Sequence, residues 1–395
     1  MSEIYLTIFF ISVLLLFLGS GIWVGISMIG VSTIGMIMFT SRPVGDAMAT
    51  TMWSMGSSWS LTALPLFVWM GEILFRTKLS ENLFKGLSPW LARLPGGLIH
   101  VNVLGCAIFA AISGSSAATV ATVGKMSIPE LRKRNYPEKF LLGTLAGSGT
   151  LGLLIPPSII LIIYGVTVEE SIAKLFIAGI IPGIGLAFLF MAYVVFWSLK
   201  NKGIMPIISE DFSFSEKIKK SGQLLPVILL IFAVIGSIYG GIATATEAAS
   251  LGVLGALVLS YFQKSLTKES FSKSLLGATK TSCMIAFILA GSSFLTLAMA
   301  FTGLPKNLAV FIDTLDLSPY MLLLVLTLFY IILGMFLDGI SAVVLTMAII
   351  EPMIRQAGFD MIWFGIYLVI VVEMAQITPP VGFNLFVLQG MANKD

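Results

Sequence analysis

The stretch Ala375–Asn384, AQITPPVGFN, places two consecutive prolines near the end of a long apolar segment. A second stretch, Gly152–Leu161, repeats the arrangement as GLLIPPSIIL. Proline donates no backbone hydrogen bond, and in a helix interior it costs about 3 kcal/mol or more. Irregular backbone at membrane depth survives only where it is buried in protein or lines a cavity. The two proline pairs therefore predict two broken helices whose freed carbonyls can serve as ligands.

The composition is that of a membrane protein. Of the 395 residues, 57% are apolar and 11% are charged, and the mean hydropathy is +1.00, whereas a soluble domain carries roughly 25% charged residues. A P-loop is absent from the sequence, which excludes an ATPase motor of its own. The lone His100 excludes a histidine-rich metal site, and Cys106 and Cys283 are expected as buried thiols. We expect an all-α polytopic membrane protein.

Apolar segments near the ~20 residues that cross a bilayer recur along the chain. Two of them, 97–127 and 320–350, are too long for one crossing, and each is interrupted by a polar, glycine-containing stretch, ISGSSAAT or FLDGISAV. We expect each to form a re-entrant hairpin that enters and leaves on the same face. The expected segments are 4–18, 22–40, 50–75, 97–127, 139–168, 172–199, 223–241, 245–263, 281–301, 320–350 and 361–390.

The basic residues set the orientation, because short cytoplasmic loops are enriched in lysine and arginine. Both ends of the first hairpin are flanked by basic residues, whereas acidic residues dominate around the second. The resulting topology places 19 of the 23 basic residues in the cytoplasm. It predicts a periplasmic N-terminus and a cytoplasmic Asp395, and it leaves outside Arg42, Lys174, Lys306 and Arg355.

An internal repeat is aligned by the prolines. Pro129 and Pro156 are 27 residues apart, as are Pro352 and Pro379, and the offset of 223 residues places one hairpin tip on the other. The repeats span roughly 12–165 and 235–388 and have opposite topology. Inverted repeats with broken segments at matching positions are the best sequence indication of a secondary transporter.

Two groups of residues are candidate ion sites, since hydroxyls and freed carbonyls suit Na⁺ as they suit other hard cations. In the first group, small residues that permit tight helix packing are the alternative explanation. In the second, Asp338 is costly in a membrane and usually functional, although it can also cap its own helix. The groups are Ser113, Gly114, Ser115 and Ser116 with Gly152, Ile155, Pro156, Pro157 and Ser158, and Asp338, Gly339 and Ser341 with Gln376, Ile377, Thr378, Pro379 and Pro380.

Three further acids lie within apolar segments. Glu247, in GIATATEAAS, is either an ordinary first-turn acid beside a threonine N-cap or a cavity-lining residue. Glu72 and Glu373 are either proton sites or acids paired at a helix interface. Two basic amphipathic stretches, 80–94 and 266–280, predict interfacial helices beside the two repeats.

Four motifs carry a family resemblance that covers essentially the whole chain: ISGSSAATVATVG, LGLLIPPSIILIIYG, GIATATEAASLGVLGAL and QITPPVGFNLFVLQG. They resemble the large membrane (M) subunit of tripartite ATP-independent periplasmic (TRAP) transporters, within the ion-transporter superfamily. The resemblance implies a scaffold plus an elevator-type transport domain in the bacterial inner membrane, driven by a Na⁺ gradient. Substrates would be organic acids such as C4-dicarboxylates, sialic acid or 2-oxo acids. No cofactor is expected beyond the coupling ion.

The resemblance also implies partners and a domain layout. A small four-helix membrane (Q) subunit would sit beside the chain, a periplasmic binding protein (P subunit) would deliver substrate, and nucleic acid is not expected. Relatives usually continue into one more apolar helix, whereas the sequence ends at Asp395. The implied layout is 1–96, scaffold and first arm helix; 97–168, first transport half; 169–222, linking span and loop; 223–319, scaffold and second arm helix; 320–390, second transport half; and 391–395, cytoplasmic tail.

Carried onto this sequence, the resemblance assigns residues to ions and substrate. One Na⁺ would be bound by Ser113, Ser115, Ser116, Gly152, Ile155 and Pro156, and the other by Gly339, Gln376, Thr378 and Pro379. Substrate would lie between the tips, at Ser116, Ala117, Pro157, Ser158, Asp338, Ser341, Pro380 and Asn384.

Other functions fit less well. A stand-alone Na⁺/dicarboxylate symporter of the same superfamily would need no binding protein, and it is the alternative that stays open. An intramembrane hydrolase would pair Asp338 with Glu373, but no nucleophile–base pair supports it. A passive channel does not need two inverted half-sites, which suit alternating access better. We therefore expect a transporter and not an enzyme.

Overall fold

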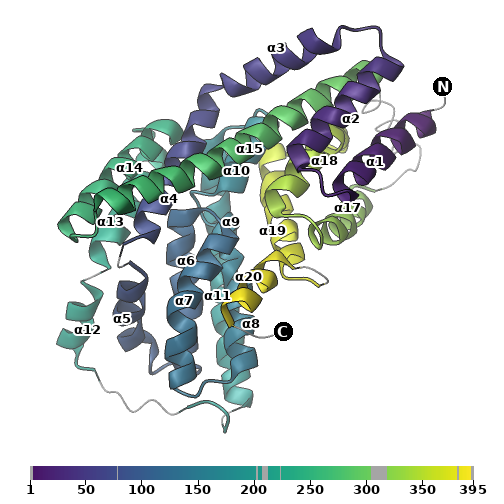
Figure 1. Ribbon diagram of the computed structural model, residues 1–395. Helices are drawn as coiled ribbons and strands as arrows, with labels where there is room; N and C mark the ends of the chain where they lie inside the picture. Colours follow the sequence, from purple (N-terminus) through teal and green to yellow (C-terminus); the bar gives the residue numbers. More distant parts are fainter. Residues whose placement is uncertain are drawn as a thin grey trace.

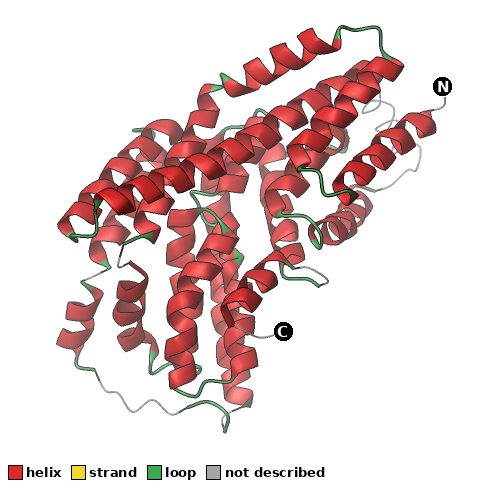
Figure 2. Cartoon of the chain, in the orientation of Figure 1, coloured by secondary structure: helices red, strands yellow, loops and turns green. Residues whose placement is uncertain are grey.

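The computed structural model describes residues 3–77, 79–201, 203–206, 212–222, 224–303, 318–379 and 382–392. Within these ranges every regular element is helical, as Figure 2 shows, so the expected all-α class is confirmed. The helices are α1 (Glu3–Gly19), α2 (Val24–Phe39), α3 (Val44–Gly56), α4 (Ala63–Phe75), α5 (Leu79–Leu91), α6 (His100–Ser113), α7 (Ser116–Lys133), α8 (Glu138–Gly149), α9 (Leu151–Leu154), α10 (Ile159–Thr167), α11 (Ile172–Lys200), α12 (Phe214–Ser221), α13 (Leu225–Tyr239), α14 (Ala245–Phe262), α15 (Lys268–Thr302), α17 (Pro319–Gly334), α18 (Gly339–Gln356), α19 (Met361–Gln376) and α20 (Phe383–Ala392).

Several helices have the length and composition needed to cross a membrane. Among the described residues α11, α14, α15 and α18 qualify alone, and three bent pairs raise the total to 7. One bent pair, α8 and α9 with α10, turns by 41° at the first proline pair, as the sequence predicted. The expected segment 50–75 is bent, because α3 and the helical stretch Trp59–Phe75 meet at 55°. Glycine and two serines, Gly56 to Ser58, interrupt the helix there.

The long helix α15 was not expected from the sequence. The stretches 266–280 and 281–301 were predicted as an interfacial helix and a separate span, but they form one helix of 35 residues. A threonine capping box at Thr267 starts it, and the isolated Gly277 inside does not break it. For 80–94 the predicted helix is confirmed: α5 is a separate amphipathic helix packed on α6 and α12.

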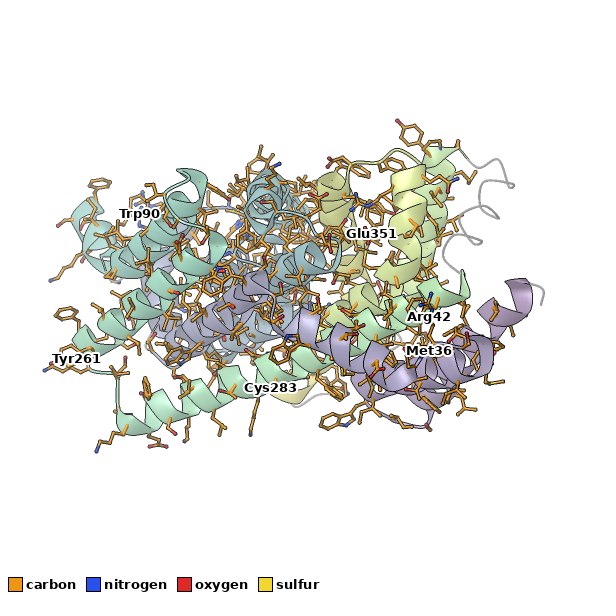
Figure 3. All side chains as sticks on the ribbon, turned by 90° about the horizontal axis from the view of Figure 1, so that it is seen from above. Met36, Arg42, Trp90, Tyr261, Cys283 and Glu351 are labelled. Carbon is orange, nitrogen blue, oxygen red and sulfur yellow. The ribbon has the colours of Figure 1, made fainter. Side chains whose placement is uncertain are left out.

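In Figure 1, α15 runs across the upper part of the molecule and links distant helices. It packs against α2, α3 and α4 and also contacts α18. The view from above in Figure 3 places Cys283, on α15, between Tyr261 at one side and Met36 toward the other. Near this second side the Arg42 guanidinium lies 5.3 Å from the centre of the Phe301 ring.

The two halves of the chain meet through α10, α18 and α19. Tyr164 on α10 is fully buried and donates a hydrogen bond of 2.7 Å to the carbonyl of Met361, where α19 begins. Tyr330 on α17 is also fully buried, and its hydroxyl lies 2.6 Å from the Thr346 hydroxyl on α18. Aromatic side chains anchored by one hydrogen bond thus fix the helices around the proline breaks.

Candidate functional site

The first hairpin tip joins α6 to α7 through two residues. Gly114 ends α6 in the left-handed conformation, with φ of 58°. Ser115 is extended and caps α7, accepting a hydrogen bond from the backbone N–H of Ala118. Within the tip, the Ser113 hydroxyl lies 2.9 Å from the hydroxyl of Thr119. The break predicted from ISGSSAAT is therefore a tight turn held by its own hydroxyls.

The first proline break lies directly beneath this tip. Ser158 caps α10 after the cis Pro156–Pro157 bond, and its hydroxyl donates to the Leu153 carbonyl. The N–H of Ile159 donates to the carbonyl of Gly114 at 3.2 Å, which ties the break to the tip. A Cβ on Gly152 would lie 2.6 Å from the carbonyl oxygen of Ser115. The structure thus brings together the residues of the first predicted ion site, and both prolines are buried.

The second tip precedes α18. Asp338 caps this helix and accepts a hydrogen bond of 3.1 Å from the N–H of Ser341. A Cβ on Gly339 would lie 2.4 Å from Nε2 of Gln376 at the end of α19. The capping explanation for Asp338 is correct, and the half-buried carboxylate still lies at the tip. Gly339 and Gln376 are adjacent, as the second predicted group requires.

The second proline break separates α19 from α20. Ile377 ends α19, and the Thr378 hydroxyl donates a hydrogen bond of 2.7 Å to the carbonyl of Met374. Pro379 is exposed, while Pro380 lies outside the described residues. Asn384 on α20 is fully buried, and both polar atoms of its side chain lack a hydrogen-bond partner within the described part of the chain. An amide in that state is suited to receive a polar ligand.

Glu373 connects the two tips. It is 3% exposed, and its Oε1 accepts a hydrogen bond of 2.5 Å from the hydroxyl of Ser116. Its Oε2 is buried without a partner among the described groups. One turn further along α19 lies Gln376, the neighbour of Gly339. The two hairpin tips therefore meet on a single turn of α19.

The structure resolves the alternatives for the other acids. Glu247 forms a capping box with Thr244: its carboxylate accepts from the Thr244 N–H at 2.8 Å, and its own N–H donates to the Thr244 hydroxyl at 3.3 Å, so the N-cap explanation is correct. Glu72 pairs with Arg76 at 2.9 Å and packs against Gly277 of α15, an interface role. Of the three acids, Glu373 is the one that lies at the tips. Its place in the sequence, one helical turn before Gln376, is the feature that could have identified it.

Three more residues lie in the first turns of α7 and α18. Two of them were assigned to the substrate, and the sequence analysis did not identify the third. Ala117 lies half-buried in the first turn of α7, and Ser341 is 1% exposed in the first turn of α18. Thr119 was not singled out, yet its hydroxyl donates 2.8 Å to the carbonyl of Ser115 and stabilises the first tip. A threonine one turn after a serine N-cap is the signal that could have identified it.

The comparisons with known proteins agree with this architecture. Residues 10–395 match the family described as tripartite ATP-independent periplasmic transporter, DctM component. The C4-dicarboxylate TRAP transporter large permease protein DctM of Pseudomonas aeruginosa is 34% identical over 362 residues, covering 91% of this chain and 84% of the relative. The isethionate TRAP transporter permease protein DctMQ of Oleidesulfovibrio alaskensis is 32% identical and covers 96% of this chain but 59% of the relative.

A third relative is the sialic acid TRAP transporter large permease protein SiaM of Vibrio cholerae, 30% identical, covering 93% of this chain and 86% of the relative. Membership of a transporter family indicates transport and not catalysis. The apolar helices and the family together indicate a multi-pass protein of the inner membrane. The chain belongs to the DctM component family of tripartite ATP-independent periplasmic transporters.

Proposed function

We propose that this chain is the permease subunit of a Na⁺-driven importer of organic acids. The relatives are named for C4-dicarboxylate, isethionate and sialic acid, all small organic anions. A periplasmic binding protein would deliver the substrate, and a small membrane subunit would complete the complex. The fused DctMQ relative, of which this chain covers 59%, supports the small subunit. The stand-alone symporter is not favoured, since these relatives are named as parts of TRAP systems.

One observation carries the proposal: the two tips converge on α19. Ser116 of the first tip donates to Glu373, and Gly339 of the second tip packs against Gln376. The N-termini of two helices, a carboxylate and one amide side chain are thereby gathered in one small region. Capped helix N-termini carry partial positive charge and favour an anion, whereas oxygen-rich breaks favour a hard cation.

The first Na⁺ would be bound in the first tip and break by Ser113, Ser115, Ser116, Gly152, Ile155 and Pro156. The second would be bound by Gly339, Gln376, Thr378 and Pro379. Support for the first site is the close approach of Gly152 to the Ser115 carbonyl, which excludes any larger residue. Support for the second is that Gly339 and Gln376 are adjacent.

The substrate carboxylate would lie between the tips. The proposed contacts are Ser116, Ala117, Pro157, Ser158, Asp338, Ser341, Pro380 and Asn384. Asn384 supports this placement best, because a buried amide without a partner is costly unless a ligand completes it. We further propose the inverted repeat, with a periplasmic N-terminus, and elevator-type alternating access in which the hairpins and broken helices move together.

The proposal is tested by the thermal stability of the full chain, co-purified with its small subunit, in NaCl and in KCl at equal ionic strength. An ion that binds only the folded state stabilises it by about 2.7 kcal/mol at 100 times its Kd. We expect a Na⁺-specific rise in Tm that Ser115→Ala or Thr378→Ala reduces. Equal stability in the two salts would refute Na⁺ coupling and would make Glu373 the first acid to test for proton coupling.

A further inference from the structure

A large open cavity lies apart from the tips. Its volume is about 1250 Å³, and it is lined by the end of α4, by α5, by α7 and by Phe212 and Lys220 at α12. In Figure 1, α5, α12 and α7 lie side by side around this region. The volume exceeds the roughly 300–1,000 Å³ of ordinary ligand pockets. It is therefore large enough for a small hydrated anion to enter and leave.

The walls of this cavity are strongly basic. Among the described lining residues five are cationic, Arg76, Lys85, Lys125, Arg134 and Lys220, and Glu130 is the only carboxylate. Glu72, bonded to Arg76 at 2.9 Å, adds a second carboxylate, and Glu130 lies 3.9 Å from Arg134, so cationic side chains outnumber carboxylates among the described residues here. Clefts lined by one sign of charge concentrate ions of the opposite sign. The cavity thus favours anions.

Two buried polar atoms of lining residues have no hydrogen-bond partner among the described residues. The hydroxyl of Thr122 on α7 is 2% exposed and lacks a hydrogen bond in the described structure. The same holds for Nε of Arg76, although the other end of this guanidinium is bonded to Glu72. Buried polar groups are normally satisfied. Beside the cavity, these two polar atoms are left unsatisfied by the described protein groups.

Helix α7 connects this cavity to the tips. Ser116, Thr119, Thr122 and Lys125 are spaced three residues apart, so each neighbours the next on the helix surface. Ser116 contacts Glu373, whereas Thr122 and Lys125 line the cavity. At 1.5 Å per residue the row spans about 13–14 Å along the axis. The polar row thus winds half-way around α7, from the tip on one face to the basic cavity on the opposite face.

We propose that this cavity is an anion vestibule, a weak binding site for small di- or tricarboxylates between the tips and the aqueous phase. Its occupant is a soluble carboxylate that shares the chemistry of the transported acid. The inference rests on the proposed function, because it takes the tips as the transport site. It adds a second, charge-selective site that would hold released substrate and let carboxylates on that side slow transport.

The electrostatic part is tested with a cysteine reporter. Cys106 is buried as expected, but Cys283 is exposed, so the expectation for Cys283 is wrong and it must be removed. In a Cys283→Ser background, Ser88→Cys places a thiol in the α5 wall of the cavity. The full chain, co-purified with its small subunit in Na⁺-free buffer, is labelled with anionic and with cationic methanethiosulfonate reagents. Ser20→Cys, an exposed position at the end of α1, gives the reference rates.

We compare the ratio of the labelling rate with the anionic reagent to that with the cationic reagent. This ratio should be roughly 10-fold higher at Ser88→Cys than at Ser20→Cys, because the basic lining attracts the anionic reagent even though solvent partly screens the charges. Lys125→Gln should lower the ratio at Ser88→Cys about 2–5-fold. Lys139→Gln, which removes an exposed charge outside the cavity lining, should leave it unchanged. Succinate should slow labelling by both reagents, whereas neutral succinamide should not.

Equal ratios at the two reporters, or no protection by succinate, would overturn the vestibule. Protection in phosphatidylglycerol nanodiscs without succinate, absent in phosphatidylcholine nanodiscs, would assign the cavity to a lipid headgroup and overturn the soluble occupant. Because labelling is done without Na⁺, its outcome is independent of the NaCl and KCl comparison. If labelling shows a charge-selective cavity but NaCl does not stabilise the protein relative to KCl, the vestibule is supported and only the Na⁺-driven function is refuted.

Discussion

The two tip-and-break pairs occur at matching places in the sequence, but they are held together differently. At the first pair the contact is backbone on backbone, with Gly152 against the Ser115 carbonyl and a hydrogen bond from Ile159 to Gly114. At the second pair Gly339 meets the amide end of the Gln376 side chain. Pro156 is buried, whereas Pro379 is exposed. The first pair is therefore closed by backbone contact, whereas the second is closed by the end of a side chain.

The sharpest test of this difference is the same substitution at the two glycines. Gly152→Ala forces a Cβ to within 2.6 Å of a carbonyl oxygen, so backbone must shift. We expect a loss of stability of about 3 kcal/mol or more, at the upper end of overpacking costs, and no transport. Gly339→Ala displaces a side-chain end at 2.4 Å, with Val372 as a second neighbour at 2.8 Å, and should cost about 1 kcal/mol. Thermal unfolding and uptake in proteoliposomes measure both.

Gly143→Ala is the matched control, because nothing lies within 4 Å of the added Cβ on α8. It should leave Tm unchanged or slightly raised, since alanine favours helix over glycine. The comparison fails if Gly152→Ala and Gly339→Ala destabilise equally. It is sharpened if Gln376→Ala restores the stability of Gly339→Ala.

The link between the halves gives the next largest effect. Ser116 and Glu373 are joined by a bond of 2.5 Å between buried groups 257 residues apart in sequence. In a double-mutant cycle with Ser116→Ala and Glu373→Gln, we expect a coupling energy of about 1–2 kcal/mol in unfolding free energy. Coupling near zero would mean that the two tips are stabilised independently, and the convergence on α19 would lose its energetic basis.

Capping of the second tip gives a smaller effect. Asp338→Ala removes the acceptor of the Ser341 N–H and should cost about 1 kcal/mol, whereas Asp338→Asn keeps a good cap and should be nearly neutral. Uptake by the Asp338→Asn variant then separates capping from a role toward substrate. If Asn restores both stability and transport, the carboxylate acts as a cap alone.

The sequence was informative where structure is local. Proline pairs, glycine tips and serine or threonine caps act on the residues beside them. Both breaks and both turns could therefore be predicted from the residue types alone. The Ser116–Glu373 contact could not, because it depends on how distant helices pack. Helix α15 was divided wrongly at residue 280, since a change in hydropathy marks where a helix meets apolar surroundings and not where it ends. A single glycine costs only about 1 kcal/mol, so Gly277 does not end the helix.

The two amphipathic stretches, 80–94 and 266–280, here called the arms, also differ and give the smallest effect. In the first half α5 is separate and is braced by α12, where Nε1 of Trp90 donates 2.7 Å to the Ser221 hydroxyl. In the second half the matching stretch is the beginning of α15. The brace therefore depends on the stability of a short helix, α12, which starts with a capping box between Ser213 and Glu216.

Hydrogen bonds from the backbone N–H and hydroxyl of Ser213 lower the pKa of Glu216. A carboxyl whose folded pKa is depressed contributes stability above its unfolded pKa, near 4.3, and loses it as pH falls through the folded value. We expect amide hydrogen exchange in α12, corrected for intrinsic rates, to be slower at pH 6 than at pH 3. Glu216→Gln should remove this pH dependence while leaving α13 unaffected. Equal loss of protection in α12 and α13 on acidification would show that the brace is not an independent unit, and the contrast between the arms would then rest on α15 alone.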